Sequence, residues 1–128
     1  MFDFARYQAG ESYGSHALHL GPGLAAQWRM LYPGHEGEDD RVPAGMLCVI
    51  TMRAYTSLIT PRPPGNIHGR QRFDVGRLPK FGERVTTSIH CESKEIRNGR
   101  FWVHLLFETL DASGAYLFRG RFVSIVAR

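Results

Sequence analysis

"PAGMLCVITMRAYTSL", residues 43–58, has the pattern of a buried helix, and the fold follows from how such a helix is covered. Pro43 suits the first helical position, where a missing N–H costs no hydrogen bond. The apolar side chains of this stretch cover more than one helical face; they are Met46, Leu47, Val49, Ile50, Met52, Ala54 and Leu58. A helix that is apolar on most sides is normally buried. It is expected to end before "TPRPPG" (60–65), which is rich in proline.

After this helix the hydrophobic period changes to two, which is the period of β-strands. The candidate strands are 66–75, 84–93, 101–110 and 115–127. The Asn98–Gly99 dipeptide favours a tight hairpin turn, and "DASG" (111–114) predicts a second turn. The last three strands are therefore predicted to form an antiparallel meander.

Two shorter elements are predicted before the buried helix. "SHALHL" (15–20) alternates weakly, as a short strand does. "GPGLAAQWRMLY" (21–32) places Leu24, Trp28 and Leu31 at the spacing of an amphipathic helix.

These elements predict an α+β domain that spans residues 1–128, because the chain has 128 residues and no linker divides it. A curved antiparallel sheet would wrap one side of the buried helix. A chain of this length cannot also cover the other side, so a homodimer with its two helices back to back is expected. A central helix wrapped by such a sheet is the hot-dog fold.

The composition is that of a soluble globular protein, with 43% hydrophobic and 22% charged residues. No apolar run is long enough to span a membrane. The N-terminal residues include acids and lack a basic start followed by an apolar block, which argues against a secretory signal. A reducing cytoplasm is the expected location.

Cys48 and Cys91 do not form a disulfide framework, and both are expected to be small core residues. The histidines and cysteines lack zinc-ligand spacing, and no phosphate-binding loop is present, so we expect neither a metal nor a cofactor. Arginines and lysines are dense between residues 62 and 84. This stretch suits a solvated basic face or an anionic ligand, and no nucleic-acid-binding motif accompanies it.

The chain resembles the MaoC-like hydratase/dehydratase branch of hot-dog proteins. The resemblance rests on "GMLCVITMRAY" (45–55), on "RLPKFGERV" (77–85) and on the meander with its Asn-Gly turn, and it spans about residues 10 to 128. It implies addition of water to, or its removal from, enoyl and 3-hydroxyacyl thioesters of coenzyme A or acyl carrier protein. In that family an Asp and a His on a loop before the helix act as general acid and base, and a glycine amide at the helix start stabilises the enolate.

In this chain the corresponding loop reads "YPGHEGEDDRVPAGM" (32–46) and lacks the Asp-x-Asn-Pro-x-His pattern of the family. The candidate catalytic residues are His35 as base, Asp39 or Asp40 as its carboxylate partner, and Gly45 as amide donor. The alternatives are a solvated loop histidine, acids that favour the helix dipole, and a glycine that permits close packing.

The candidate substrate-binding residues are Tyr32, His68, Arg70 and Arg72. Tyr32 would donate to the thioester carbonyl or pack against the helix that it ends. His68 precedes Gly69, which leaves room for a ligand, although a structural histidine fits the same pattern. Arg70 and Arg72 share a strand face and suit the phosphates of coenzyme A or an acidic carrier protein.

Three functions remain open at this point. The leading hypothesis is an enoyl-thioester hydratase or 3-hydroxyacyl dehydratase. A hot-dog thioesterase, with Asp40 activating water, is a second enzyme. The altered loop favours a third hypothesis, a non-catalytic hot-dog subunit that binds an acyl chain or pairs with a catalytic partner in a heterodimer.

Overall fold

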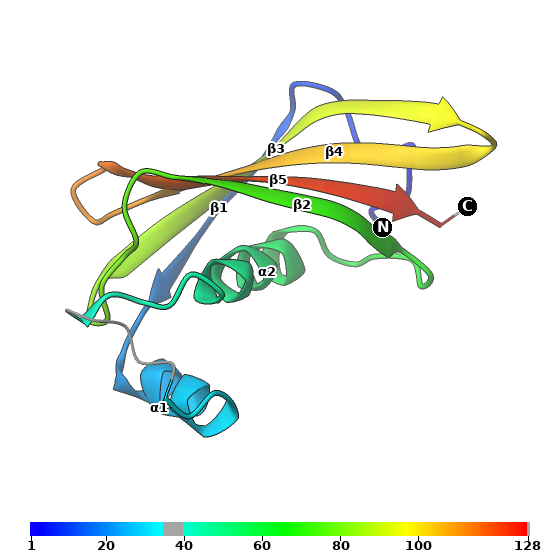
Figure 1. The fold of residues 1–128 in the computed structure, drawn as a ribbon. Helices are drawn as coiled ribbons and strands as arrows, with labels where there is room; N and C mark the ends of the chain where they lie inside the picture. The colour runs from blue at the N-terminus through cyan, green and yellow to red at the C-terminus, as the bar shows by residue number, and fades with distance from the viewer. Residues whose placement is uncertain (35–39, 128) are drawn as a thin grey trace.

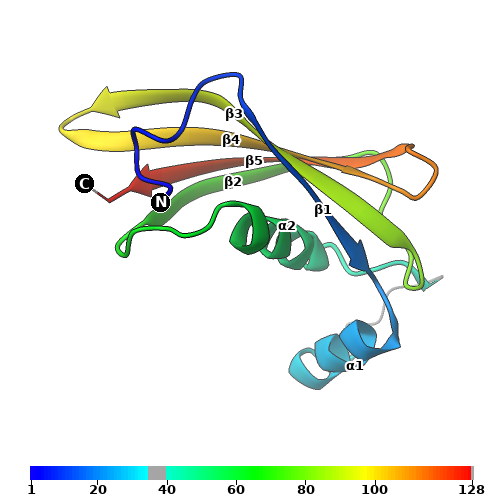
Figure 2. The same ribbon diagram turned by 180° about the vertical axis from the view of Figure 1, so that it is seen from behind.

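The computed structural model describes residues 1–34 and 40–127. The described part has two helices and five strands: β1 (Ser12–His19), α1 (Pro22–Leu31), α2 (Met46–Leu58), β2 (Ile67–Val75), β3 (Arg84–Arg97), β4 (Arg100–Leu110) and β5 (Tyr116–Val126). The strands form one antiparallel sheet in the order β1-β3-β4-β5-β2. The long helix α2 lies along one face of the twisted sheet, and α1 lies beyond α2, away from the strands (Figures 1 and 2). This arrangement confirms the predicted hot-dog fold.

Helix α2 begins three residues later than predicted, because residues 43–45 form a tighter turn. The amides of Met46, Leu47 and Cys48 donate to the carbonyls three residues earlier, at distances of 2.9, 3.1 and 3.3 Å. Such turns are common at helix starts. Gly45 is the N-cap residue of the regular helix.

The core lies between α2 and the sheet. Helix α2 buries Met46, Leu47, Ile50, Thr51, Ala54 and Tyr55, and the strands bury alternate residues such as Val85, Ile89, Leu105, Phe107 and Phe122. This alternation follows the predicted faces of 84–93 and 101–110. We call the face of the sheet that carries α2 the inner face and the opposite face the outer face.

The hairpin between β3 and β4 is the predicted Asn-Gly turn, with φ of 52° at Asn98 and 71° at Gly99. Both central residues have positive φ, as the tight turn that matches the twist of a hairpin requires. Strand β3 runs to Arg97, four residues further than predicted, because the register shifts after Cys91 and pairing with β4 continues.

One prediction about the core was wrong. Cys91 is buried, whereas Cys48 is exposed, on the side of α2 next to β2. The apolar pattern of α2 is too wide for one sheet face to bury, so one side of the helix stays outside the core. In the part of the chain that the structure describes, no helix is long and apolar enough to cross a membrane.

Candidate functional site

The start of α2 presents a backbone donor that has no partner. Among residues 1–34 and 40–127, no acceptor lies within hydrogen-bond reach of the Gly45 amide, whereas the next three amides close the preceding turn. The N-terminus of a helix carries a partial positive charge. A free amide at this position suits an anion or the oxygen of a polarised carbonyl.

The Trp28 ring of α1 packs beside Gly45, and the Tyr32 ring packs on Trp28. The Trp28 and Tyr32 rings are 4.6 Å apart between centroids. A Cβ at position 45 would lie 3.2 Å from Trp28 Cη2, so glycine allows the indole this close to α2. The Nε1 atom of Trp28 is buried and has no hydrogen-bond partner in the described part of the chain. The Trp28 ring, which the sequence spacing explained as simple packing, therefore brings a second unpaired N–H to this region.

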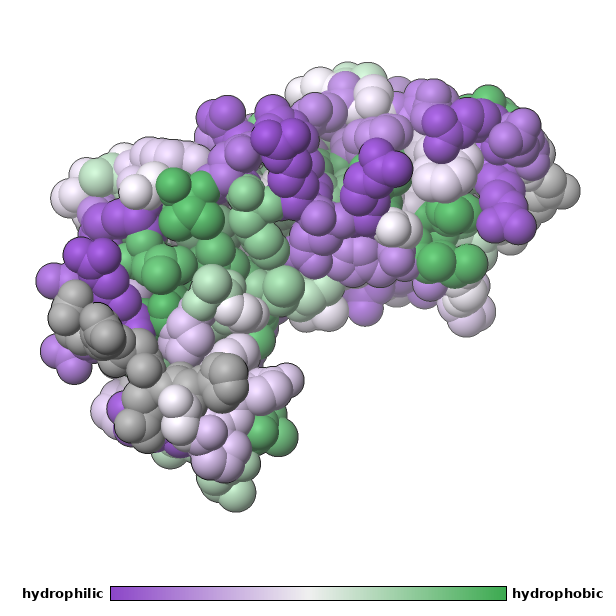
Figure 3. Space-filling model, in the orientation of Figure 1, coloured by the Kyte–Doolittle hydropathy of each residue, from purple (hydrophilic) through white to green (hydrophobic). Residues whose placement is uncertain are grey.

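An apolar groove of about 350 Å³ runs along the open side of α2. Its lining comes from Cys48, Val49, Met52, Arg53 and Thr56. In the view of Figure 3, apolar surface gathers around α2 and the neighbouring end of the sheet, whereas hydrophilic surface covers much of the strands above. The groove begins one turn after Gly45 and offers an acyl chain a continuous apolar surface.

A polar strip connects β2 to α2 on the inner face. Gln71 Nε2 donates to Thr51 Oγ1 at 3.5 Å, and the Cys48 thiol lies 3.9 Å from Gln71 Oε1. Gln71 was not among the predicted site residues. Gln71 could have been recognised as a polar residue that shares the apolar face of the predicted strand with Phe73.

Two of the predicted catalytic residues, His35 and Asp39, lie outside the described residues. Asp40 is described, with φ of 64°, and its carbonyl accepts a hydrogen bond of 2.8 Å from the Phe81 amide. The next residue, Arg41, forms a β-bridge with Lys80, which lies in the same loop as Phe81. The structure therefore holds Asp40 at the connection between β2 and β3.

His68 lies on the inner face but near the far end of α2. Its ring packs on Phe122 at 3.8 Å between centroids, and Phe122 also contacts Tyr55. Since Tyr55 comes ten residues after Gly45, the helix separates the two ends by about 15 Å. Burial lowers the pKa of His68, and a hydrogen bond with the Arg70 backbone opposes that shift. The structure thus places Tyr32 against Trp28, which packs on Gly45, and leaves His68 apart from them.

Arg70 and Arg72 are on the outer face, opposite α2. In the β2–β5 ladder they are paired with Val123 and Arg121, whereas Gln71 is paired with the buried Phe122. The two predicted arginines therefore do not join the site at Gly45 within one chain.

The ion pairs of the described residues either hold loops together or lie on the outer face of the sheet. Arg77 bonds Glu83 at 2.7 Å and Asp111 at 3.0 Å, next to the turn after β4. Hydrogen bonds from the Ser113 hydroxyl and the Ala115 amide, together with Arg77, lower the pKa of Asp111 to about 2.

The described residues contain one ion pair between a histidine and a carboxylate, His104 with Glu95 at 3.6 Å, and it lies on the outer face. No cluster of three potential metal ligands occurs among them. An imidazole–carboxylate pair beside Gly45 would thus have to include the loop residues His35 or Asp39.

The fold is shared with solved structures at low sequence identity. The MaoC-like dehydratase from Rhodospirillum rubrum aligns with a TM-score of 0.81 at 14% identity, over 100% of this chain and 99% of that one. The R-hydratase PhaJ1 from Pseudomonas aeruginosa aligns with a TM-score of 0.76 at 16% identity, over 98% and 86% of the two chains.

A dehydratase complex is also similar in structure. The HadBC 3R-hydroxyacyl-ACP dehydratase complex from Mycobacterium tuberculosis aligns with a TM-score of 0.74 at 14% identity, over 91% of this chain and 96% of that one. No protein-family model matches the sequence, and no curated protein matches it. At these identities the comparisons establish the fold of the chain.

Proposed function

We propose that the chain is an acyl-thioester hydratase or dehydratase that acts on enoyl or 3-hydroxyacyl groups held on coenzyme A or acyl carrier protein. The observation that carries this proposal is the unpaired Gly45 amide at the start of α2, next to an apolar groove. The fold similarity to a MaoC-like dehydratase and an R-hydratase supports it.

In this proposal the thioester carbonyl lies at the start of α2 and the acyl chain follows the groove. The Gly45 amide donates to the carbonyl oxygen, where negative charge develops as the α-carbon loses its proton. The unpaired Trp28 Nε1–H and the Tyr32 hydroxyl are further candidate donors. His35, with Asp39 or Asp40, moves the protons of water and of the α-carbon.

The proposal includes a homodimer. Helix α2 leaves Val49, Met52 and the exposed Cys48 outside the sheet, and a second copy of the chain would close this groove into a tunnel for the acyl chain at the dimer interface. A partner with a related hot-dog fold is the alternative, as in a complex of two different subunits. Light scattering of the purified chain distinguishes a monomer from a dimer.

The activity test is incubation with 2-enoyl-CoA thioesters of several chain lengths, followed by loss of enoyl absorbance and mass identification of the product. Hydration that is lost in His35→Gln and kept in His90→Gln supports the proposal, because His90 is on the outer face. Release of free coenzyme A instead would identify a thioesterase. No turnover by a folded protein, at any chain length, would reject the enzyme proposal.

Two substitutions of Gly45 test the amide itself. Gly45→Ala and Gly45→Pro both add a Cβ beside Trp28, and the φ of −61° at this position suits proline. Only proline lacks the N–H. Gly45→Pro should lower kcat by about 10² to 10³ relative to Gly45→Ala, as loss of an oxyanion donor does. Equal rates in the two variants would show that the amide has no catalytic part.

A non-catalytic acyl-binding or partner subunit is the second candidate. It is favoured by the position of Asp40 at the β2–β3 connection and by the distance of His68 from Gly45. A fluorescent acyl chain that binds along α2, and is displaced when Met52→Arg charges the groove, would support this function if no thioester is turned over.

A further inference from the structure

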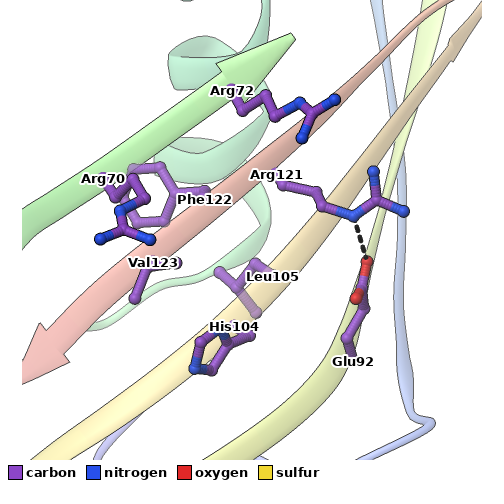
Figure 4. A pocket seen from close by; sticks show the side chains of 8 residues that line it. All are labelled: Arg70, Arg72, Glu92, His104, Leu105, Arg121, Phe122 and Val123. Atoms are coloured by element: carbon purple, nitrogen blue, oxygen red, sulfur yellow. Dashed lines mark ion pairs between the residues drawn. The ribbon is translucent and has the colours of Figure 1, made fainter. Parts of the chain in front are cut away.

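The outer face of the sheet has a depression that the proposed function does not use. Its volume is about 220 Å³, and its lining residues are Arg70, Arg72, Glu92, His104, Leu105, Arg121, Phe122 and Val123. The lining comes from the four neighbouring strands β2, β5, β4 and β3 (Figure 4). We call this depression the arginine pocket.

Two arginines of the pocket face each other across a strand pair. Arg72 on β2 is paired directly with Arg121 on β5. Like charges at such positions repel each other. Asp74, which lies outside the pocket, contacts both guanidinium groups, at 3.4 Å from Arg72 and 3.3 Å from Arg121. One carboxylate is therefore shared between two cations.

The remaining charges leave the pocket positive. Arg121 Nε is 3.3 Å from Glu92, and Figure 4 shows this pair on one side of the pocket. Arg70 has no ion pair within the described residues, and its guanidinium lies beside Val123. The lining carries three arginines and one carboxylate, and Asp74 contacts two of these arginines from outside the pocket, so the group as a whole has a net charge of one positive.

We propose that the arginine pocket binds the phosphate group of a small phosphorylated ligand. Guanidinium groups bind phosphate through paired N–H···O contacts, and the net positive charge of the group favours an anion. The volume of about 220 Å³ is below that of usual drug-sized sites, so it fits a phosphate with a small attached group. Val123 supplies an apolar floor, and Glu92 and His104 can accept hydrogen bonds from ligand hydroxyls.

This pocket is separate from the proposed acyl site. Its arginines point away from α2, whereas the alternate residues Gln71 and Phe122 of the same strands face the helix. The inference therefore does not depend on hydratase activity. Failure of one proposal leaves the other in place.

The test is a titration of the ¹⁵N-labelled full chain with inorganic pyrophosphate, followed by backbone amide and arginine Nε signals at constant ionic strength. We expect saturable shifts at Arg72, Arg121 and Val123. Arg121→Gln should weaken binding about tenfold, the fold-change of one charge-assisted hydrogen bond. Glu92→Gln should tighten it, because that change removes a negative charge and frees Arg121.

Arg84→Gln is the matched control. It removes the same charge from β3, eight residues before Glu92, which places it about 27 Å along the strand. Its pyrophosphate affinity should equal that of the wild type. The proposal is overturned if shifts grow linearly without saturation, if Arg84→Gln weakens binding as much as Arg121→Gln, or if Glu92→Gln leaves the affinity unchanged.

A parallel titration with coenzyme A identifies the source of the phosphate. Shifts at Arg72 and Arg121 that pyrophosphate displaces would assign the pocket to the phosphates of coenzyme A. If coenzyme A shifts only signals of α2 while pyrophosphate binds in the arginine pocket, the pocket would be assigned to a separate phosphorylated ligand.

Discussion

Two buried threonines under α2 offer a sharp test of how the sheet is stabilised. Thr87 on β3 and Thr109 on β4 are paired across the strands, and their hydroxyls are 2.8 Å apart. Their exposed fractions are 1% and 0%. In the described residues neither side chain has another hydrogen-bond partner. Each hydroxyl therefore depends on the other.

The perturbation is a cycle of Thr87→Val, Thr109→Val and the double variant. Valine has nearly the shape of threonine, so each single change removes one hydroxyl and leaves the other buried without a partner. That costs about 1–3 kcal/mol of unfolding free energy. In the double variant no polar atom is left unpaired, and replacing both partners by apolar groups is nearly neutral. The expected coupling between the two positions is therefore the sum of the two single losses, about 2–6 kcal/mol.

The assay is urea unfolding of the four proteins, followed by far-UV circular dichroism at one protein concentration. The slope of the transition should stay constant, so that midpoint shifts report stability. A double variant that loses the sum of the two single losses would refute the reasoning. So would single variants as stable as the wild type, because the hydroxyls would then not depend on each other.

Three further outcomes follow from the packing and the charges. Gly76→Ala places a Cβ 2.8 Å from Tyr116 Cε1, so thermal unfolding should show a loss of about 1–3 kcal/mol; an unchanged midpoint would mean that the ring moves freely. Asp111 has a pKa of about 2, below its ordinary value of 3.8, so its stabilisation is present above pH 4 and is lost as the pH falls toward 2. In urea unfolding measured at a series of pH values, Asp111→Asn should lose less stability toward pH 2 than the wild type does. An unchanged profile would contradict the assignment. A thiol reagent should modify the exposed Cys48 of dilute protein and leave the buried Cys91 unreacted until the protein unfolds. Equal rates of modification at the two cysteines would contradict the burial of Cys91.

The strands were predictable because their chemistry is local. Alternation from Val85 to Cys91 gives the buried face directly, and an Asn-Gly dipeptide fixes the turn that follows β3. The buried helix was predictable for a related reason, since its apolar width exceeds what a surface helix carries. The first residue of the helix was not predictable, because the tight turn and a regular helical turn differ only in whether each amide donates to the carbonyl three or four residues earlier.

The candidate site was less predictable because it depends on which elements meet. Alternation placed Arg70 and Arg72 on one face of β2, but it does not say which face carries α2. The answer comes from long-range packing, in which Phe73 and Gln71 face the helix and the arginines face outward. The contact of Trp28 with Gly45 depends on the angle between α1 and α2, which the helical spacing of either segment leaves undetermined.

The two faces of the sheet make the two proposals separable by experiment. Arg121 projects outward between Gly120 and Phe122, which are both buried on the inner face. A change at Arg121 therefore alters the outer charge without removing an inner side chain. If pyrophosphate changes the rate of hydration in the wild type but not in Arg121→Gln, the sheet must transmit the effect, because its strands supply residues to both faces. If the rate is independent of pyrophosphate in both proteins, the two faces act independently, as the alternation of side chains by itself implies.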